Sequence, residues 1–236
     1  MRRIAIIECG QVPVGIRDRF PSYPDMFRRL LAPLAPGLEF ETVSVVQGAP
    51  VPAVEAFDGY LYTGSRHGVL DGLPWVPPLE ALIRAAHGLG KPQVGICFGH
   101  QLMAQALGGT VEKARQGWGV GKQRYALRRG GHEVELDVAV FHQDQVTVPP
   151  PGARVVAVNG FCPYGGLAYG ETALTFQFHP EFADPYLAAL IDDCDGRVLT
   201  HDLAEAARAS MGSPTSAGDP VRWMAEVLMG GADGRG

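Results

Sequence analysis

Residues 95–101 read Gly-Ile-Cys-Phe-Gly-His-Gln, and this stretch decides how the chain folds. The apolar run of residues 93–96 leads into Cys97, and the helix-compatible run of residues 101–107 leaves it. Glycines two residues before and two residues after Cys97 suit a sharp strand–turn–helix elbow, because small neighbours let the chain bend. The same turn puts Cys97 at a helix N-terminus, where the dipole favours a thiolate. We therefore interpret Cys97 as a nucleophile.

A histidine and a carboxylate follow much later, in the sequence His179-Pro180-Glu181. The alternating run of residues 174–178 is typical of a strand, so His179 is expected at a strand end, where open α/β sheets carry their sites. A single cysteine or histidine is more often structural than catalytic. The elbow and the strand end together favour a catalytic triad, with Cys97 as nucleophile, His179 as base and Glu181 as the orienting carboxylate.

Apolar strands alternate with amphipathic helices over the first half of the chain. The strands are expected at residues 3–9, 40–46, 59–62 and 93–96, and the helices at 24–34, 76–88 and 101–107. This alternation implies parallel strands joined by right-handed crossovers. After Gly109 the runs 134–140, 154–158 and 174–178 alternate in a way more typical of antiparallel pairing. The sequence predicts an α/β fold with an open, mixed, mostly parallel sheet, flanked by helices, and an antiparallel flank.

Helices are expected in the C-terminal third of the chain, with a linker before the last of them. Asp184 is predicted to cap a helix with Pro185 at its first position, and further helices are expected from residues 202 and 219. Residues 211–219 form a linker rich in serine, proline and glycine. We therefore predict a main domain over residues 1–210 and a linker with a C-terminal helix over 211–236, with residues 231–236 frayed.

Composition narrows the class of protein. The 236 residues carry a formal net charge of −5 without a basic block, so nucleic acid is not an expected partner. The apolar runs are too short for a membrane span or a signal peptide, and a cytoplasmic protein is expected. Four cysteines stand far apart without a metal-ligand spacing, so free thiols are expected in a reducing compartment, with no metal site.

The elbow and the His-Pro-Glu run together resemble the class I (triad) glutamine amidotransferase family, over roughly residues 1–192. Supporting stretches are Tyr62-Thr63-Gly64-Ser65, residues 117–121 and residues 141–146. The last of these is similar to the His-x-Asp-x-Val stretch of stand-alone members related to the amidotransferase half of GMP synthetase. The resemblance is greatest to a gamma-glutamyl peptidase-like branch. It implies a flavodoxin-like three-layer fold.

The resemblance also implies further site residues. The backbone N–H of Phe98 would be one oxyanion donor, and Gly64 or Ser65 would supply the second, although Ser65 stands where relatives often have glycine. The glutamyl end of a substrate would lie against Gln101 and the segment near His142, Gln143 and Asp144. Structural readings stay open: Gln101 as a solvent-facing helix residue, His142 as a strand-end histidine, Asp144 as a loop brace and Trp118 as part of the core.

The function implied is cysteine-dependent cleavage of the γ-carboxamide of glutamine through a γ-glutamyl thioester, with ammonia delivered to a separate synthetase partner. This chemistry requires no metal or organic cofactor. The alternative is an independent γ-glutamyl peptidase or hydrolase that acts on small peptides or amines. Two further readings are a non-enzymatic binding relative and a hydrolase that shares the cysteine elbow but has a histidine directly after the nucleophile. Phe98 at that place disfavours the last reading.

Overall fold

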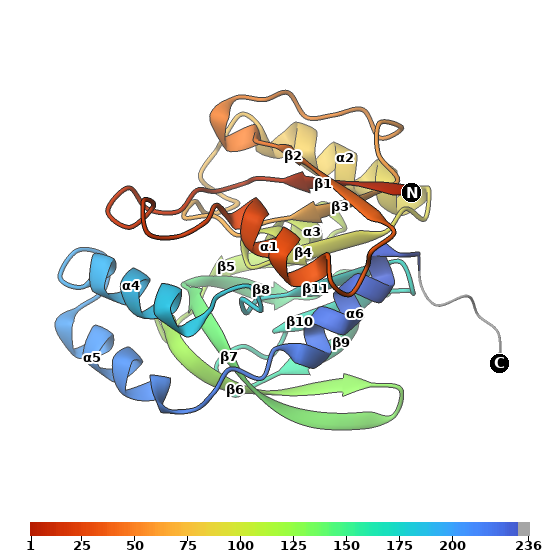
Figure 1. The fold of residues 1–236 in the computed structure, drawn as a ribbon. Coiled ribbons are helices and arrows are strands. Elements are labelled where there is room, and N and C mark those ends of the chain that lie inside the picture. Colours follow the sequence, from red (N-terminus) through yellow and green to blue (C-terminus); the bar gives the residue numbers. More distant parts are fainter. Residues whose placement is uncertain (231–236) are drawn as a thin grey trace.

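The computed structural model describes residues 1–230, so the fraying expected for residues 231–236 lies outside the described residues (Figure 1). One nine-stranded sheet runs through the molecule in the order β2-β1-β3-β4-β11-β10-β9-β6-β7. Its first five strands are parallel: β2 (Leu38–Val43), β1 (Arg2–Ile7), β3 (Gly59–Tyr62), β4 (Gln93–Ile96) and β11 (Ala173–Phe176). The other four pair antiparallel: β10 (Gly166–Tyr169), β9 (Arg154–Val158), β6 (Gly119–Arg129) and β7 (His132–His142). This arrangement confirms the predicted fold class.

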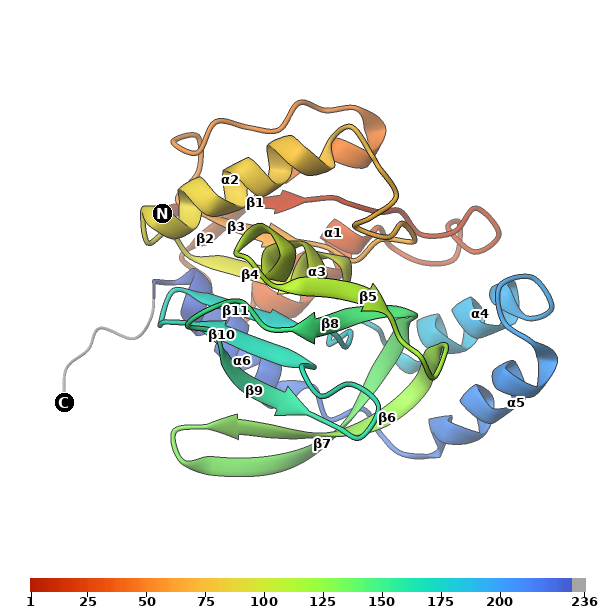
Figure 2. The same ribbon diagram turned by 180° about the vertical axis from the view of Figure 1, so that it is seen from behind.

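Helices cover both faces of the parallel part. The helices α1 (Tyr23–Leu31) and α6 (Gly218–Leu228) lie on one face, and α2 (Val76–Gly88) and α3 (Phe98–Ala106) lie on the other, as the opposite views of Figures 1 and 2 show. The helices α4 (Asp184–Cys194) and α5 (His201–Ala209) pack beside β6, and a small antiparallel pair joins β5 (Thr110–Lys113) to β8 (Asp144–Val148). Short 3₁₀ turns occupy Val45–Gln47 and Ser210–Gly212.

The alternation of side chains along β1 explains the three layers. Ile4 and Ile6 belong to the apolar cluster beneath α1 and α6, whereas Ala5 and Ile7 belong to the cluster beneath α2 and α3. Because both faces of the strand are buried there, residues 4–7 of β1 form a continuous apolar run rather than an alternating one. The same holds for β3 and β4, every residue of which is buried. The parallel core thus forms a rigid support for the loops at its carboxyl end.

Some local predictions differ from the structure. The strand expected to reach residue 46 ends at Val43, because a 3₁₀ turn begins at Val45. Asp184 is not a cap: Ala183 holds that position without a side-chain bond, and Asp184 is the first residue of α4. Its carboxylate instead binds Lys122 at 2.8 Å and Thr215 at 2.8 Å. The strands β5, β6, β8 and β10 were not expected, and the stretch of residues 117–121 proves to contain the start of β6.

The segment before α6 is tied down, and α6 belongs to the core. The buried ammonium of Lys122 bonds the carbonyl of Ser213, and the N–H of Ser216 donates to the carbonyl of Asp137 at 2.8 Å. Trp223 and Met224 lie in the same apolar cluster as Val94 and Ile96. The C-terminal helix therefore packs on the sheet. The division of the chain at residue 210 stays a prediction.

Candidate active site

Cys97 sits at a strained elbow between β4 and α3. Its φ of +51° is the only positive φ at a non-glycine among the described residues, and such backbone is kept where the surroundings enforce it. A methyl group on Gly95 would lie 2.6 Å from the carbonyl oxygen of Gly99, and one on Gly99 would collide with the carbonyl of Tyr62. Both glycines are thus needed for the close approach of strand and helix. The Cys97 side chain is buried but lines a cleft.

His179 and Glu181 form a buried pair immediately after β11. The Nδ1 of His179 lies 2.8 Å from Oε1 of Glu181, and the backbone N–H of His179 donates to the carbonyl of Ala139 at 2.8 Å. Burial alone would lower the pKa of His179. The charges of Glu181 and Cys97, together with side-chain hydrogen bonds to both, more than reverse this and raise the pKa of His179 to about 10. The imidazole is therefore held as a cation beside the thiol.

Sheet order explains how these groups meet. β4 and β11 are adjacent parallel strands with Ile96 opposite Phe176, so the chain leaves both at the same edge. β3 lies on the other side of β4, and Gly64 follows it. A methyl group on Gly64 would lie 2.9 Å from Cε1 of His179 and 3.6 Å from Cβ of Cys97. Cys97, His179 and Gly64 therefore converge at the carboxyl ends of three neighbouring strands, where open α/β sheets bind ligands.

The residues expected to bind an oxyanion lie at this place. Phe98 is the first residue of α3, and amides in the first turn of a helix have no partner within that helix. Gly64 is buried, and Ser65 is half-buried at the wall of the cleft. The Ser65 hydroxyl accepts a bond of 3.1 Å from the N–H of His67, which orders this turn.

Gln101 and His142 are joined through one carbonyl. Gln101 is buried and not solvent-facing; its Nε2 donates to the carbonyl of Asp144 at 2.7 Å and to Oε1 of Gln177 at 3.1 Å. Nδ1 of His142 lies 3.0 Å from the same carbonyl of Asp144. Because a carbonyl only accepts, Nδ1 carries the proton. The other ring nitrogen, Nε2, is buried and has no partner among residues 1–230.

The charge state of His142 follows from its surroundings. Burial lowers the pKa of His142 to about 4, the bond to the Asp144 carbonyl offsets this in part, and the charge of His179 lowers it further. At neutral pH its Nε2 is therefore a free acceptor on an uncharged ring. The half-buried carboxylate of Asp144 also lines the cleft, where burial raises its pKa, Lys113 lowers it and Asp71 raises it.

The cleft above Cys97 has a volume of about 1080 Å³. The expected residues Gly64, Ser65, Cys97, Gln101, His142, Gln143, Asp144 and His179 all line it, whereas Phe98 and Glu181 lie behind its surface. Its far walls were not predicted from the sequence: they include residues 10–18 of the loop after β1, Tyr23 of α1 and the end of α4 with Asp193 and Arg197. No motif marks these residues. Trp118 was expected either to belong to the core or to cover the site. It packs on Phe141 and also lines the cleft.

The other histidine near the elbow is structural. His100 is fully buried, and its Nδ1 lies 2.8 Å from the hydroxyl of Thr175. Burial lowers the pKa of His100 to about 3, with His142 lowering it further. Within residues 1–230, no group of three histidine, cysteine or carboxylate side chains is arranged to hold a metal ion. Nor does any helix in that part combine the length and apolar character needed to span a bilayer.

The chain is similar to known proteins both in sequence and in fold. The family model of glutamine amidotransferase class-I matches residues 72–186, which contain Cys97, His179 and Glu181. Gamma-glutamyl peptidase 4 of Arabidopsis thaliana is 27% identical over 208 residues, covering 83% of this chain and 82% of that protein. A glutamine-hydrolysing GMP synthase of Aromatoleum aromaticum is 34% identical over 142 residues, 52% of this chain but only 25% of that protein. The crystal structure of a glutamine amidotransferase from Methylobacillus flagellatus shares the fold, with a TM-score of 0.75 and 22% identity over 97% of this chain and 92% of that one.

Proposed function

Because this chain carries a class-I glutamine amidotransferase domain over residues 72–186, we propose that it cleaves γ-glutamyl amide bonds with Cys97 as the nucleophile. The observation that carries the proposal is the bond of 2.8 Å between His179 Nδ1 and Glu181 Oε1 at the strand end next to the Cys97 elbow. This pair directs Nε2 of His179 away from Glu181. It leaves that nitrogen to hold the thiol as a thiolate–imidazolium pair.

The reaction follows from these positions. The Cys97 thiolate attacks the γ-carbonyl carbon, and the oxyanion accepts hydrogen bonds from the N–H of Phe98 and from the N–H of Gly64 or Ser65. The carbon–nitrogen bond breaks as His179 gives its proton to the departing nitrogen. Water then attacks the γ-glutamyl thioester and passes a proton to His179, and the carbon–sulfur bond breaks to return the thiolate.

Two acceptors beside the cleft suit the α-ammonium of a glutamyl group. Nε2 of Gln101 donates twice within the protein, so Oε1 is the end of its amide that is left for a ligand. The unpartnered Nε2 of the neutral His142 is a second acceptor, but it is buried beside Gly119, so a ligand reaches it only if the His142 ring turns. Both are anchored on the carbonyl of Asp144, which fixes their separation. Gln143 and Asp144 complete this side of the cleft.

The size of the cleft favours a leaving group larger than ammonia. A volume of about 1080 Å³ is at the upper end of the roughly 300–1,000 Å³ typical of sites for drug-sized ligands, and a single glutamine would fill a small part of it. The coverage of a gamma-glutamyl peptidase along four fifths of both chains agrees with this. We therefore place an independent γ-glutamyl peptidase or amide hydrolase first. A glutaminase that passes ammonia to a synthetase partner is the second candidate, favoured by the match to part of a GMP synthase.

A substrate panel tests the proposal. The purified protein is given L-glutamine, glutathione and neutral γ-glutamyl amides, and the released glutamate and amine are quantified. Cys97→Ala should abolish release, whereas Cys162→Ala, which removes another buried thiol, should not. Turnover of peptides or amides above that of glutamine supports the peptidase. Weak glutamine hydrolysis alone supports the amidotransferase, and release that survives Cys97→Ala contradicts both.

A further inference from the structure

The turn after β11 brings a phenyl ring flat against the imidazole of His179. The ring centroids of His179 and Phe182 are 3.9 Å apart, and the two planes differ by 5°. A bond of 3.4 Å from the N–H of Phe182 to the carbonyl of His179 closes the turn. Pro180 restricts the backbone within it. Residues 179–182 thus fold back on themselves, so that Glu181 and Phe182 both contact His179.

This stacking differs from the other histidine–aromatic pairs of the protein. His142 meets Phe161 at 5.7 Å and 75°, and His87 meets Tyr169 at 6.3 Å and 76°. Uncharged rings prefer edge-to-face or offset-stacked contact, because their quadrupoles disfavour a direct sandwich. A cation, by contrast, is attracted to the face of an aromatic ring within about 6 Å. The flat contact at His179 therefore suits a charged imidazolium, whose charge faces the phenyl ring.

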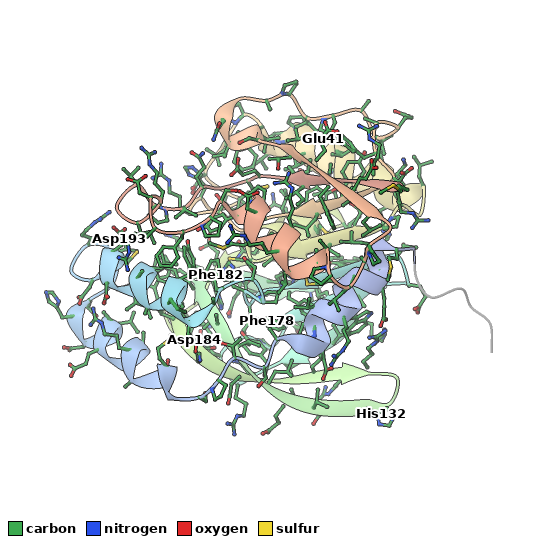
Figure 3. All side chains as sticks on the ribbon, viewed as in Figure 1. Glu41, His132, Phe178, Phe182, Asp184 and Asp193 are labelled. Carbon is green, nitrogen blue, oxygen red and sulfur yellow. The ribbon has the colours of Figure 1, made fainter. Side chains whose placement is uncertain are left out.

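Phe182 has little freedom to leave this position. Tyr186 of α4 meets it edge-on at 4.5 Å, and Tyr23 of α1 lies at 5.9 Å. The hydroxyl of Tyr186 donates to that of Tyr23 at 2.9 Å, which joins the two helices behind the phenyl ring. Figure 3 shows Phe182 at the start of α4, facing α1. All three aromatic residues are buried.

The imidazole is thus held from three directions. Phe182 covers one face, Gly64 stands against the Cε1 edge, and Glu181 binds Nδ1. Rotation of the ring would break the bond to Glu181 and would lose the stacking. Nε2 is left as the ring atom for contact with Cys97.

We propose that Phe182 is a positioning residue: its ring fixes the His179 imidazole in the plane that directs Nε2 to Cys97 and stabilises the protonated form. The catalytic consequence rests on the proposed function, but the effect on the imidazole does not. The ionisable groups that interact with His179 are Glu181, Cys97 and His142, and Tyr23 and Tyr186 interact with Glu181. Burial lowers the pKa of His142 to about 4 and raises that of Tyr23 well above its usual value, so both are neutral at neutral pH. Replacement of Phe182 changes none of these charges.

The direct test is the titration of the His179 ring, followed by NMR of protein labelled with ¹³C at histidine. The resonance is assigned by its loss in His179→Gln. Phe182→Leu should lower the pKa of His179 by about half a unit to one and a half units, because an aliphatic side chain fills the space without an aromatic face. Phe182→Tyr keeps the face and should stay within about 0.3 units of the wild type. Phe57→Leu, at another buried phenylalanine remote from the site, controls for general loss of packing and should not move the titration.

Activity supplies a second readout. With a γ-glutamyl substrate, Phe182→Leu should reduce kcat about tenfold with KM within about twofold, and Phe182→Tyr should restore most of kcat. An unmoved His179 titration in folded Phe182→Leu overturns the inference, as does an equal shift in Phe57→Leu. If no γ-glutamyl compound is cleaved by the wild type, the proposed function fails while the NMR titration still decides the role of Phe182.

Discussion

The backbone N–H of Cys97 donates a hydrogen bond of 2.8 Å to the carbonyl of Phe176, three residues before His179. The strained elbow and the strand that carries the histidine are therefore joined directly through the main chain. A shift of β11 relative to β4 would break this bond. The same shift would also move the imidazole away from the thiol. The distance between the thiol and the imidazole therefore depends more on the register of β4 and β11 than on the conformations of the two side chains.

Loss of the Glu181 charge should change the histidine more than the fold. Among the interactions that raise the pKa of His179, the charge of Glu181 is the largest. Glu181→Gln should lower the pKa of His179 toward its usual range and should reduce kcat/KM by about 10²-fold, less than the loss in His179→Ala. The pH dependence of kcat/KM measures both effects. An unchanged alkaline limb in Glu181→Gln would argue against the pair as the source of the cation.

Gly64→Ala should inactivate the protein. The added methyl group would lie 2.9 Å from Cε1 of His179, a contact that forces the ring or the turn to move. Misplacement of a reacting group by about 1 Å can cost about 10²-fold, and we expect a loss of that size in kcat. Gly37→Ala provides a contrast, since nothing lies within 4 Å of the added group and the φ of Gly37 is not positive. Equal activity in Gly64→Ala and the wild type would place the imidazole elsewhere.

Stability should fall on mild acidification because two histidines are buried uncharged. The pKa of His100 is lowered to about 3 and that of His142 to about 4, whereas the unfolded chain takes up these protons near pH 6.5. The unfolded state thus binds more protons from about pH 6.5 down to about 4, and the free energy of unfolding decreases over that window, by roughly 3 kcal/mol for each of the two histidines.

Urea denaturation at several pH values measures this loss. His100→Gln should be less stable than the wild type at neutral pH, because the bond to Thr175 is altered, but its stability should vary less with pH. The exposed His132 on the β6–β7 hairpin (Figure 3) serves as the control, and His132→Gln should follow the wild type. A His100→Gln slope equal to that of the wild type would contradict the prediction.

Lys122→Met should loosen the segment before α6. The buried ammonium binds Asp184 at 2.8 Å and the carbonyl of Ser213, and methionine keeps most of the aliphatic volume. Because Asp184 is half-exposed and stays solvated, the loss should be about 1–2 kcal/mol. Limited proteolysis should show faster cleavage within residues 211–217. Arg124→Met, which removes an exposed ion pair with Asp137, should leave that cleavage rate close to the wild type.

The parts of the fold that depend on local sequence pattern could be predicted from the sequence. The elbow at Cys97, the helix of residues 76–88 and the strand of residues 59–62 follow from glycine spacing and apolar periodicity, and the structure has them. The strand β6 was not predicted because its residues have mixed surroundings. Tyr125 and Leu127 face the core, whereas some of their neighbours reach solvent on the extended β6–β7 hairpin.

The far walls of the cleft could not be predicted from the sequence for a different reason. Residues 10–18 and the end of α4 enter the cleft wall only through the packing of distant segments, as where Gly15 approaches Asp193. No pattern within either segment encodes that contact. Phe182 is adjacent to Glu181 in sequence, but its importance lies in the angle between two rings, which depends on Tyr23 and Tyr186 from two helices.

The pairing of Ile96 with Phe176 has a consequence for synthesis of the chain. The cysteine is made long before the strand that carries its histidine, and all of the antiparallel flank lies between them in sequence. A ribosome-bound chain that stops short of β11 holds the thiol without its base or its carboxylate. Contacts so distant in sequence form slowly, so the thiol of Cys97 meets the imidazole of His179 only once the last central strand has inserted.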